Sequence, residues 1–251
     1  MENYREGAER FYDLFGEKDD IDFYVKQAKA SGGKALEIGV GTARLALHLA
    51  RAGIETWGVE PSSHMLKAAE KNIAREDKET QERLHMVKGD AESFKLPERF
   101  GLIYFPSCSF DHILTPMNQK AALVNIKNHL APKGRYVFDL YLVKELVADS
   151  GWFVQRKKLL DGSQVIRSGH HVTRPEKRLM SLDMWYDHVV DGRVTERFYE
   201  GSDVYVHDVE GIRLLLGEAG FEITEEYGDH HSKPYEKGDP MIVFVTTPKK
   251  P

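Results

Sequence analysis

The stretch Lys34-Ala-Leu-Glu-Ile-Gly-Val-Gly-Thr-Ala-Arg-Leu-Ala-Leu-His-Leu-Ala-Arg-Ala-Gly53 decides the fold, because it has the pattern of a buried strand, a glycine turn and a helix. The expected strand, residues 35–38, is short and largely apolar on both faces, as in a central parallel strand. Gly39 and Gly41 remove side chains where the backbone must turn sharply and approach a ligand, and Thr42 opens a helix whose first N–H groups point into that turn. The pattern predicts a nucleotide-binding turn at the start of a βαβ unit.

The rest of the chain continues this alternation of strands and helices. Four more strands are expected at 55–59, 84–88, 101–105 and 135–141, with helices beginning near Ser62 and at Asn118 and a solvated helix end and loop over 75–83. A helix capped by Asp208 and two strands, 221–227 and 241–246, complete the pattern. We therefore predict an α/β fold with a doubly wound, seven-stranded, mostly parallel sheet.

Two regions depart from this alternation. From Tyr4 to Ala30 we expect two amphipathic helices, which make residues 1–33 an N-terminal helical cap. Between residues 151 and 206, turn signals at Asp161-Gly162 and Asp191-Gly192 separate stretches rich in Val, Tyr, Phe and Trp, which is typical of antiparallel hairpins. Residues 34–150 and 207–251 are then the nucleotide-binding domain, and 151–206 are an antiparallel β insertion.

Composition limits the partners and the compartment. A net charge of -5 and a pI near 6.1 give no general attraction to nucleic acid or to anionic lipid. The single cysteine, Cys108, excludes an internal disulfide framework, and no apolar segment resembles a signal peptide or a membrane span, so we expect a cytoplasmic protein. The histidine pairs His170-His171 and His230-His231 lack a third ligand at metal-binding spacing, and we predict no metal site.

Two cofactor classes fit the glycine turn: dinucleotides and S-adenosylmethionine. A dinucleotide fingerprint has a third glycine where this chain has Arg44. Glu60, at the end of the second expected strand, fits the ribose-binding acid of either class, since one carboxylate accepts hydrogen bonds from two vicinal hydroxyls. The turn alone does not separate the two classes.

The residues that follow separate them through a resemblance. Leu36-Glu37-Ile-Gly39-Val-Gly41-Thr42 resembles motif I of class I S-adenosylmethionine-dependent methyltransferases, and Asp90-Ala91, Leu130-Ala-Pro-Lys-Gly134 and Leu216-Gly-Glu-Ala-Gly-Phe221 resemble later marks of that family in the same order. The resemblance covers nearly the whole chain and implies a Rossmann-like methyltransferase fold with an antiparallel seventh strand. Val40, Ala43 and Glu60, where Asp is common, depart from the family pattern.

The resemblance assigns the cofactor-binding residues. Glu60 matches the acid that accepts both ribose hydroxyls, and Asp90 either meets the adenine amino group or only caps a turn. Glu37 either contacts the cofactor or fixes the glycine loop, because a buried unpaired carboxylate would be costly. The residues assigned to the cofactor are Tyr12, Tyr24, Glu37, Gly39, Gly41, Thr42, Glu60, Pro61, Met65, Asp90, Ala91 and Phe105.

The loop after the fourth strand, Phe105-Pro-Ser-Cys-Ser-Phe-Asp-His112-Ile-Leu114, indicates the acceptor class. It lacks the Asn-Pro-Pro-Tyr signature of amino-methylating DNA enzymes and is similar to the serine-rich loop of sugar amine N-methyltransferases. His112 and Tyr12 are the candidate catalytic residues: His112 orients the acceptor or takes its proton, or else packs under the loop. Tyr12 and Tyr24 contact the donor or acceptor, or pack in the core.

The sequence therefore predicts an enzyme that transfers a methyl group from S-adenosylmethionine to an amine or hydroxyl of a small-molecule acceptor. The insertion is expected to cover the acceptor pocket or to form a subunit contact, and a homo-oligomer stays open. The alternatives are a non-catalytic S-adenosylmethionine-binding domain and a nicotinamide-dependent dehydrogenase.

Overall fold

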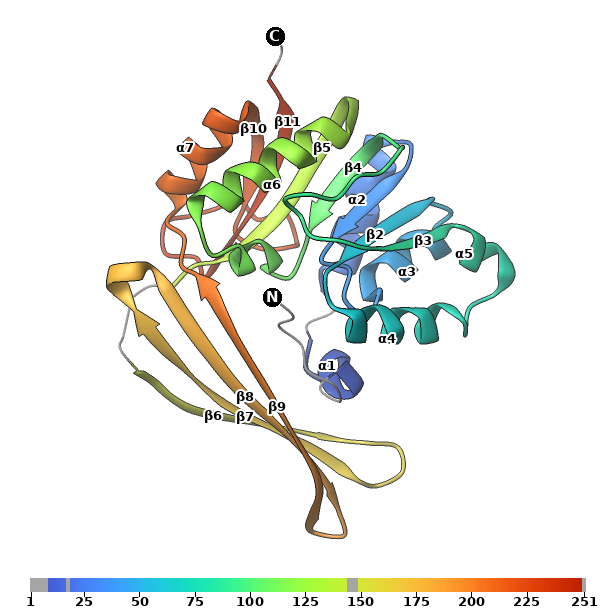
Figure 1. Ribbon diagram of the computed structural model, residues 1–251, viewed down its shortest axis with the longest axis vertical. Coiled ribbons are helices and arrows are strands. Elements are labelled where there is room, and N and C mark those ends of the chain that lie inside the picture. The colour runs from blue at the N-terminus through green and yellow to red at the C-terminus, as the bar shows by residue number, and fades with distance from the viewer. Residues whose placement is uncertain (1–8, 17–18, 144–148, 250–251) are drawn as a thin grey trace.

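The computed structural model describes residues 9–16, 19–143 and 149–249, and its larger part is a seven-stranded sheet (Figure 1). The strand order is β10-β11-β5-β4-β1-β2-β3, in which β1 to β5 are parallel and β11 is antiparallel to both of its neighbours. The strands are β1 (Ala35–Ile38), β2 (Thr56–Glu60), β3 (Leu84–Lys88), β4 (Phe100–Phe105), β5 (Leu130–Tyr141), β10 (Phe221–Tyr227) and β11 (Met241–Pro248). The predicted doubly wound, mostly parallel sheet is confirmed.

Helices cover both faces of this sheet because each has an apolar stripe to bury (Figure 1). On one face, Ile126 of α6 and Leu216 of α7 join a core that includes Phe138. On the other face, Tyr24 of α2 and Leu45 of α3 pack with Val137. The helices are α1 (Glu9–Phe15), α2 (Ile21–Ser31), α3 (Arg44–Arg51), α4 (Ser63–Ile73), α5 (Lys78–Glu82), α6 (Pro116–His129) and α7 (Val209–Ala219), with the 3₁₀ turns η1 (Ser109–His112) and η2 (Pro175–Lys177).

The insertion is a second sheet of four antiparallel strands in the order β6-β7-β8-β9. Its strands are β6 (Asp149–Lys158), β7 (Gln164–Arg174), β8 (Leu179–Val190) and β9 (Arg193–Tyr205). Helix α1 packs on this sheet through Phe11, which lies in a cluster with Val165 and Tyr186, and it also contacts α4 of the main domain. The first helix therefore lies between the two sheets, as Figure 1 shows.

The structure differs from the sequence-based expectation in several local details. The segment 75–83, expected to be a helix end and loop, contains the separate short helix α5, whose first turn is capped by Asp77, the acceptor of a 2.8 Å hydrogen bond from the Thr80 N–H. Helix α3 begins at Arg44 and not at Thr42, because Ala43 adopts a left-handed conformation with φ 65°. The start of the N-terminal helix expected from Tyr4 lies outside the described residues. None of the helices in the described part of the chain is long and apolar enough to cross a membrane.

Candidate active site

A cavity of about 890 Å³ lies at the carboxyl ends of β1, β2 and β4 and extends to the insertion sheet. In open α/β sheets this edge is where ligands bind. Its wall includes ten of the predicted site residues: Tyr12, Gly39, Gly41, Glu60, Pro61, Met65, Asp90, Ala91, Phe105 and His112. Residues from α1, the main sheet and the loop after β4 therefore meet around one space.

The glycine turn after β1 depends on backbone conformations that favour glycine. Gly39 and Gly41 have φ values of 66° and 56°, in the left-handed region. A Cβ on Gly39 would also lie 3.3 Å from Cε2 of Phe105. The turn consequently presents bare backbone to the cavity, as close approach of a cofactor requires.

Glu60 holds the turn from the end of β2. Its Oε2 accepts a 2.9 Å hydrogen bond from the Gly41 N–H, and its Oε1 accepts one of 2.9 Å from the Ser62 N–H. The side chain is buried, and this burial raises the pKa of the carboxyl, although the two N–H donors oppose the shift. A carboxylate has about four acceptor sites, so two backbone donors leave room for two ribose hydroxyls. The turn and this acid thus fit a ribose-bearing cofactor.

Another part of the cavity wall combines apolar side chains with an exposed acid. Met65, Ala91 and Phe105 are buried and line it, whereas Asp90 is exposed and accepts a 2.7 Å hydrogen bond from the Ser93 hydroxyl. Apolar side chains beside one exposed acid suit a flat heteroaromatic ring with an exocyclic amine. Glu92 lines the same end, and burial raises the pKa of its carboxyl.

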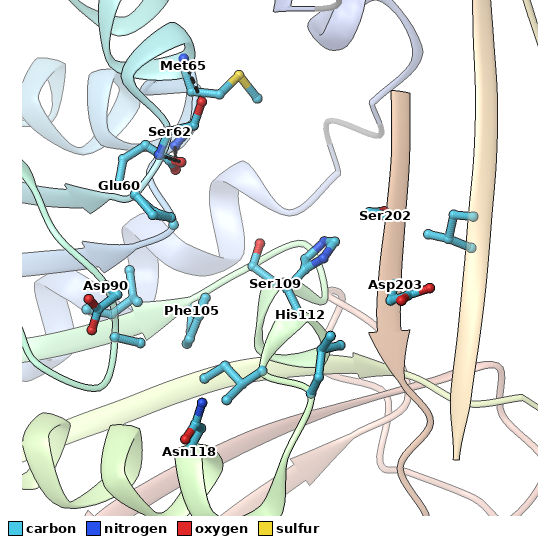
Figure 2. A pocket seen from close by; sticks show the side chains of 18 of the residues that line it. Glu60, Ser62, Met65, Asp90, Phe105, Ser109, His112, Asn118, Ser202 and Asp203 are labelled. Carbon is cyan, nitrogen blue, oxygen red and sulfur yellow. Dashed lines mark hydrogen bonds between the residues drawn. The ribbon is translucent and has the colours of Figure 1, made fainter. Parts of the chain in front are cut away.

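His112 ends η1 and faces the insertion sheet. Figure 2 shows it with Ser109 on one side of the cavity and Ser202 and Asp203 of β9 on the other. Burial lowers the pKa of its imidazole, and a hydrogen bond with the Asp203 backbone opposes that shift. Because the net shift is downward, the neutral form of His112 dominates at pH 7 and can accept a proton.

Three predicted cofactor residues do not reach the cavity wall. Tyr24 is fully buried and donates a 2.8 Å hydrogen bond to Asp139, so it belongs to the core. Glu37 is buried and accepts a 2.8 Å hydrogen bond from the Tyr104 hydroxyl, and burial raises its pKa to about 8. Thr42 is buried and donates a 3.0 Å hydrogen bond to Asp13 of α1. Glu37 is therefore hydrogen-bonded to β4 and does not line the cavity.

A buried polar cluster supports the loop between β4 and η1. Asp139 of β5 accepts a 3.2 Å hydrogen bond from the Ser107 N–H and another from the Cys108 N–H. His230 lies 3.2 Å from the same carboxylate, and its side chain is 9 % exposed. His230 is therefore mostly buried, whereas its neighbour His231 is exposed. Among the described residues, no group of three potential ligands could hold a metal ion.

The insertion sheet contributes a polar wall that the sequence did not reveal. Asp203 accepts hydrogen bonds from Arg174 at 2.8 Å and from Ser181 at 2.5 Å. Tyr199 donates a hydrogen bond to Asp183 in the same wall. The cavity residues missing from the sequence prediction include Ser109, Thr115, Asn118, Arg174, Ser181, Asp183, Tyr199 and Asp203. Strand alternation alone could not show which face of these hairpins meets the cavity.

Comparison with known proteins shows which proteins this chain is similar to. Residues 35–134, from β1 into β5, match the family described as methyltransferase domain. A curated relative, dTDP-3-amino-3,4,6-trideoxy-α-D-glucopyranose N,N-dimethyltransferase from Streptomyces venezuelae, is 28% identical over 225 residues, which cover 83% of this chain and 91% of the relative.

Two solved structures share the complete fold. The CcbJ methyltransferase from Streptomyces caelestis has a TM-score of 0.83 at 19% identity and covers 99% of this chain and 98% of its own. CalS10, an amino pentose methyltransferase from Micromonospora echinaspora solved with S-adenosylmethionine bound, has a TM-score of 0.74 at 18% identity and covers 97% of this chain and 98% of its own. At these identities the likeness shows the fold, including the inserted sheet.

Proposed function

Because this chain is a class I S-adenosylmethionine-dependent methyltransferase, we propose that it methylates an amine of a small, sugar-like molecule. The observation that carries this proposal is one cavity of about 890 Å³ bordered by the glycine turn, His112 and the insertion sheet. Cavities of roughly 300–1,000 Å³ are usual for small ligands. The comparisons give no support to a dehydrogenase or to a non-catalytic binding domain.

The donor half of the cavity would hold S-adenosylmethionine through the residues of the turn. Glu60 would accept the two ribose hydroxyls, and the backbone at Gly39 and Gly41 would lie against the methionine part. Met65 and Phe105 would enclose the adenine, with Asp90 at its amino group. The position of each residue on the cavity wall supports these assignments.

The chain's own task in the reaction is to align the acceptor and move one proton. S-adenosylmethionine supplies a methyl group on a positively charged sulfur. The lone pair of the amine attacks that carbon, an N–C bond forms as the C–S bond breaks, and the electron pair stays on sulfur. An amine is mostly protonated at neutral pH, so the acceptor ammonium would first lose a proton to neutral His112, which frees this lone pair, while the Tyr12 hydroxyl helps to orient the acceptor. The methylated product would leave as an ammonium ion, and His112 would return its proton to solvent.

The test is methyl transfer by the complete chain. Release of S-adenosylhomocysteine is measured with a panel of amino sugars and with the corresponding sugars that carry hydroxyls in place of the amines. Turnover with the amines alone supports the proposal, and turnover with the hydroxyl compounds alone contradicts it. Tight binding of S-adenosylhomocysteine by calorimetry without turnover of any acceptor would instead favour a non-catalytic binding domain.

We also propose that the enzyme works in the cytoplasm as a protein without nucleic acid partners. Its single cysteine, Cys108, fits a reducing compartment, and its net charge of -5 disfavours phosphate backbones. Analytical ultracentrifugation would distinguish a monomer from a homo-oligomer.

A further inference from the structure

The acceptor side of the cavity contains a side-chain arrangement built around Asp183. Asp183 of β8 lies directly opposite Gly201 of β9, and Tyr199 lies two residues earlier on the same strand and on the same face. A Cβ on Gly201 would lie 2.4 Å from the Tyr199 hydroxyl oxygen. Because Gly201 has no side chain, the Tyr199 side chain can pass over it, and the Tyr199 hydroxyl donates a hydrogen bond to Asp183 on the neighbouring strand.

The Asp183 carboxylate keeps acceptor capacity beyond the hydrogen bond that it receives from Tyr199. Tyr199 donates to Oδ1, and the nearest base at Oδ2 is His170, whose Nδ1 lies 3.9 Å away, beyond hydrogen-bond distance. The Asp183 side chain is 30% exposed and lines the cavity. A donor on a ligand can therefore reach this carboxylate.

The charge balance of this wall is negative. Asp183 and Asp203 are its acids, and Arg174 and His112 are the basic side chains on the described part of the cavity wall. Arg174 donates to Asp203 and to Ser181 through Nη2, so its charge is offset by a neighbouring carboxylate, while its buried Nε has no hydrogen-bond partner among the described residues. His112 is mainly neutral at pH 7 because burial lowers its pKa.

We propose that Asp183, oriented by Tyr199 over Gly201, binds an ammonium group of the acceptor and selects a cationic amine that carries no phosphate. This inference rests on the proposed function and narrows its substrate class. A carboxylate with a fixed neighbour forms a charge-assisted hydrogen bond to an ammonium group. A nucleoside diphosphate would instead place two negative phosphates beside Asp183 and Asp203, with one guanidinium that is already paired.

This substrate class differs from the one named for a relative. The Streptomyces venezuelae relative acts on a sugar linked to dTDP. The present wall offers no group of unpaired basic side chains, among the described cavity residues, to which a diphosphate could bind. The two substrate classes can therefore be separated by charge.

The test compares two forms of one amine in the complete chain. The probes are 3-amino-3-deoxy-D-glucose and its thymidine diphosphate ester, and S-adenosylhomocysteine release is measured for each. We expect kcat/KM to be at least about tenfold higher for the free amino sugar, the order of magnitude of one charge-assisted hydrogen bond. A higher value for the diphosphate ester overturns the inference while the proposed function stands. Turnover of neither probe contradicts the proposed function for amino sugars, and the inference fails with it.

Variants locate the effect at Asp183. D183N should raise KM for the free amino sugar about 10- to 100-fold with little change in kcat, since it removes a charged acceptor from the binding site. The matched control is D191N, which removes the same charge from the exposed turn between β8 and β9. Y199F, which removes only the hydroxyl, should raise KM by a smaller factor. S-adenosylhomocysteine affinity checks that each variant is folded, and an unchanged KM in folded D183N overturns the inference. If D183N does not fold, the KM of Y199F and the kcat/KM values of wild type for the two probes test the inference instead.

Discussion

Glu60 Oε2 accepts a 2.9 Å hydrogen bond from the backbone N–H of Gly41, which joins the acid at the end of β2 to the turn after β1. The carboxylate therefore has two tasks, since it fixes the turn and faces the cavity in which the ribose would lie. Loss of the side chain affects both the shape of the turn and the contacts to the ligand.

E60A should weaken S-adenosylhomocysteine binding by about 3 kcal/mol, roughly 150-fold, because two charge-assisted hydrogen bonds are lost. Isothermal titration calorimetry measures this directly. E70A, which removes an exposed acid from α4, is the control and should leave the affinity unchanged. Wild-type affinity in E60A would remove Glu60 from the cofactor site.

H112N should lower kcat about 100-fold, as expected for loss of a general base, with little change in S-adenosylhomocysteine affinity. Because burial lowers the pKa of His112 below its ordinary value of 6.5, wild-type kcat should fall on acidification with a midpoint below 6.5. The kcat profile of H112N should lack this acidic limb, whereas H231N, at an exposed histidine, should retain it. If kcat of H112N fell at acidic pH with the same midpoint as wild type, the titrating group would be a residue other than His112.

Y24F should reduce stability and leave the cofactor site intact, since Tyr24 donates its hydrogen bond to buried Asp139 and lies away from the cavity wall. Loss of one hydrogen bond to a charged group costs about 1.5–3 kcal/mol of unfolding free energy, and Asp139 keeps its other donors. Urea denaturation and calorimetry with S-adenosylhomocysteine give the two quantities. A large loss of affinity at unchanged stability would return Tyr24 to the cofactor residues.

The Asp139–His230 pair should make stability depend on pH. Burial opposes the charged imidazole, but the hydrogen bond and charge of Asp139 raise the pKa of His230 overall, and Asp20 and Asp19 act in the same direction. This contribution is complete below the unfolded value of 6.5 and is lost as the pH rises through the higher folded pKa. The pKa of Asp139 is lowered despite burial, so its contribution is present above 3.8 and is lost as the pH falls through the lower folded pKa. The pair therefore stabilises most between 3.8 and 6.5.

H230Q measures this contribution. The difference in unfolding free energy between wild type and H230Q should be about 1–3 kcal/mol at pH 5.5 and smaller at pH 8.5. H231Q, at the exposed neighbour, should show little difference at either pH. A difference for H230Q that does not change with pH would contradict a charged pair.

G201A should raise KM for the acceptor about tenfold, because its Cβ would meet the Tyr199 hydroxyl at 2.4 Å and displace it from Asp183. G217A is the control, since Gly217 lies in helix α7 and the new Cβ would lie 3.7 Å from Nζ of Lys249, an ordinary contact distance. Steady-state kinetics with saturating donor separate KM from kcat. An unchanged KM in G201A would show that Tyr199 can adjust without loss.

The parts of the molecule that the sequence predicted are those set by local spacing. The strand, turn and helix of residues 34–53 contain their own signals, and the acid at Glu60 follows at the end of the next strand. The observed strand order confirms the predicted fold class. This class was predictable because the alternation of strands and helices leaves few topologies for a parallel sheet.

The parts that the sequence could not predict depend on partners distant in the chain. The helical stripe of α2 is the same whether Tyr24 faces the core or a ligand, and Asp139, which decides it, lies on β5. In the insertion, the turn between β7 and β8 has Arg178 at φ 54° where a glycine would have signalled it. The position of Asp183 on the cavity wall likewise depends on how a whole sheet packs against the main domain.

The place of β11 in the sheet has a consequence for the order in which the nascent chain can fold. β11 lies between β5 and β10, yet β5 ends at Tyr141 and β11 begins at Met241. During synthesis, the hydrogen-bonding edge of β5, with Phe138 and Leu140, stays without its partner strand until the whole insertion sheet and α7 have left the ribosome. An uncovered apolar strand edge promotes association between chains. Translation that stalls before Met241 should therefore yield aggregating nascent chains and not a smaller soluble domain.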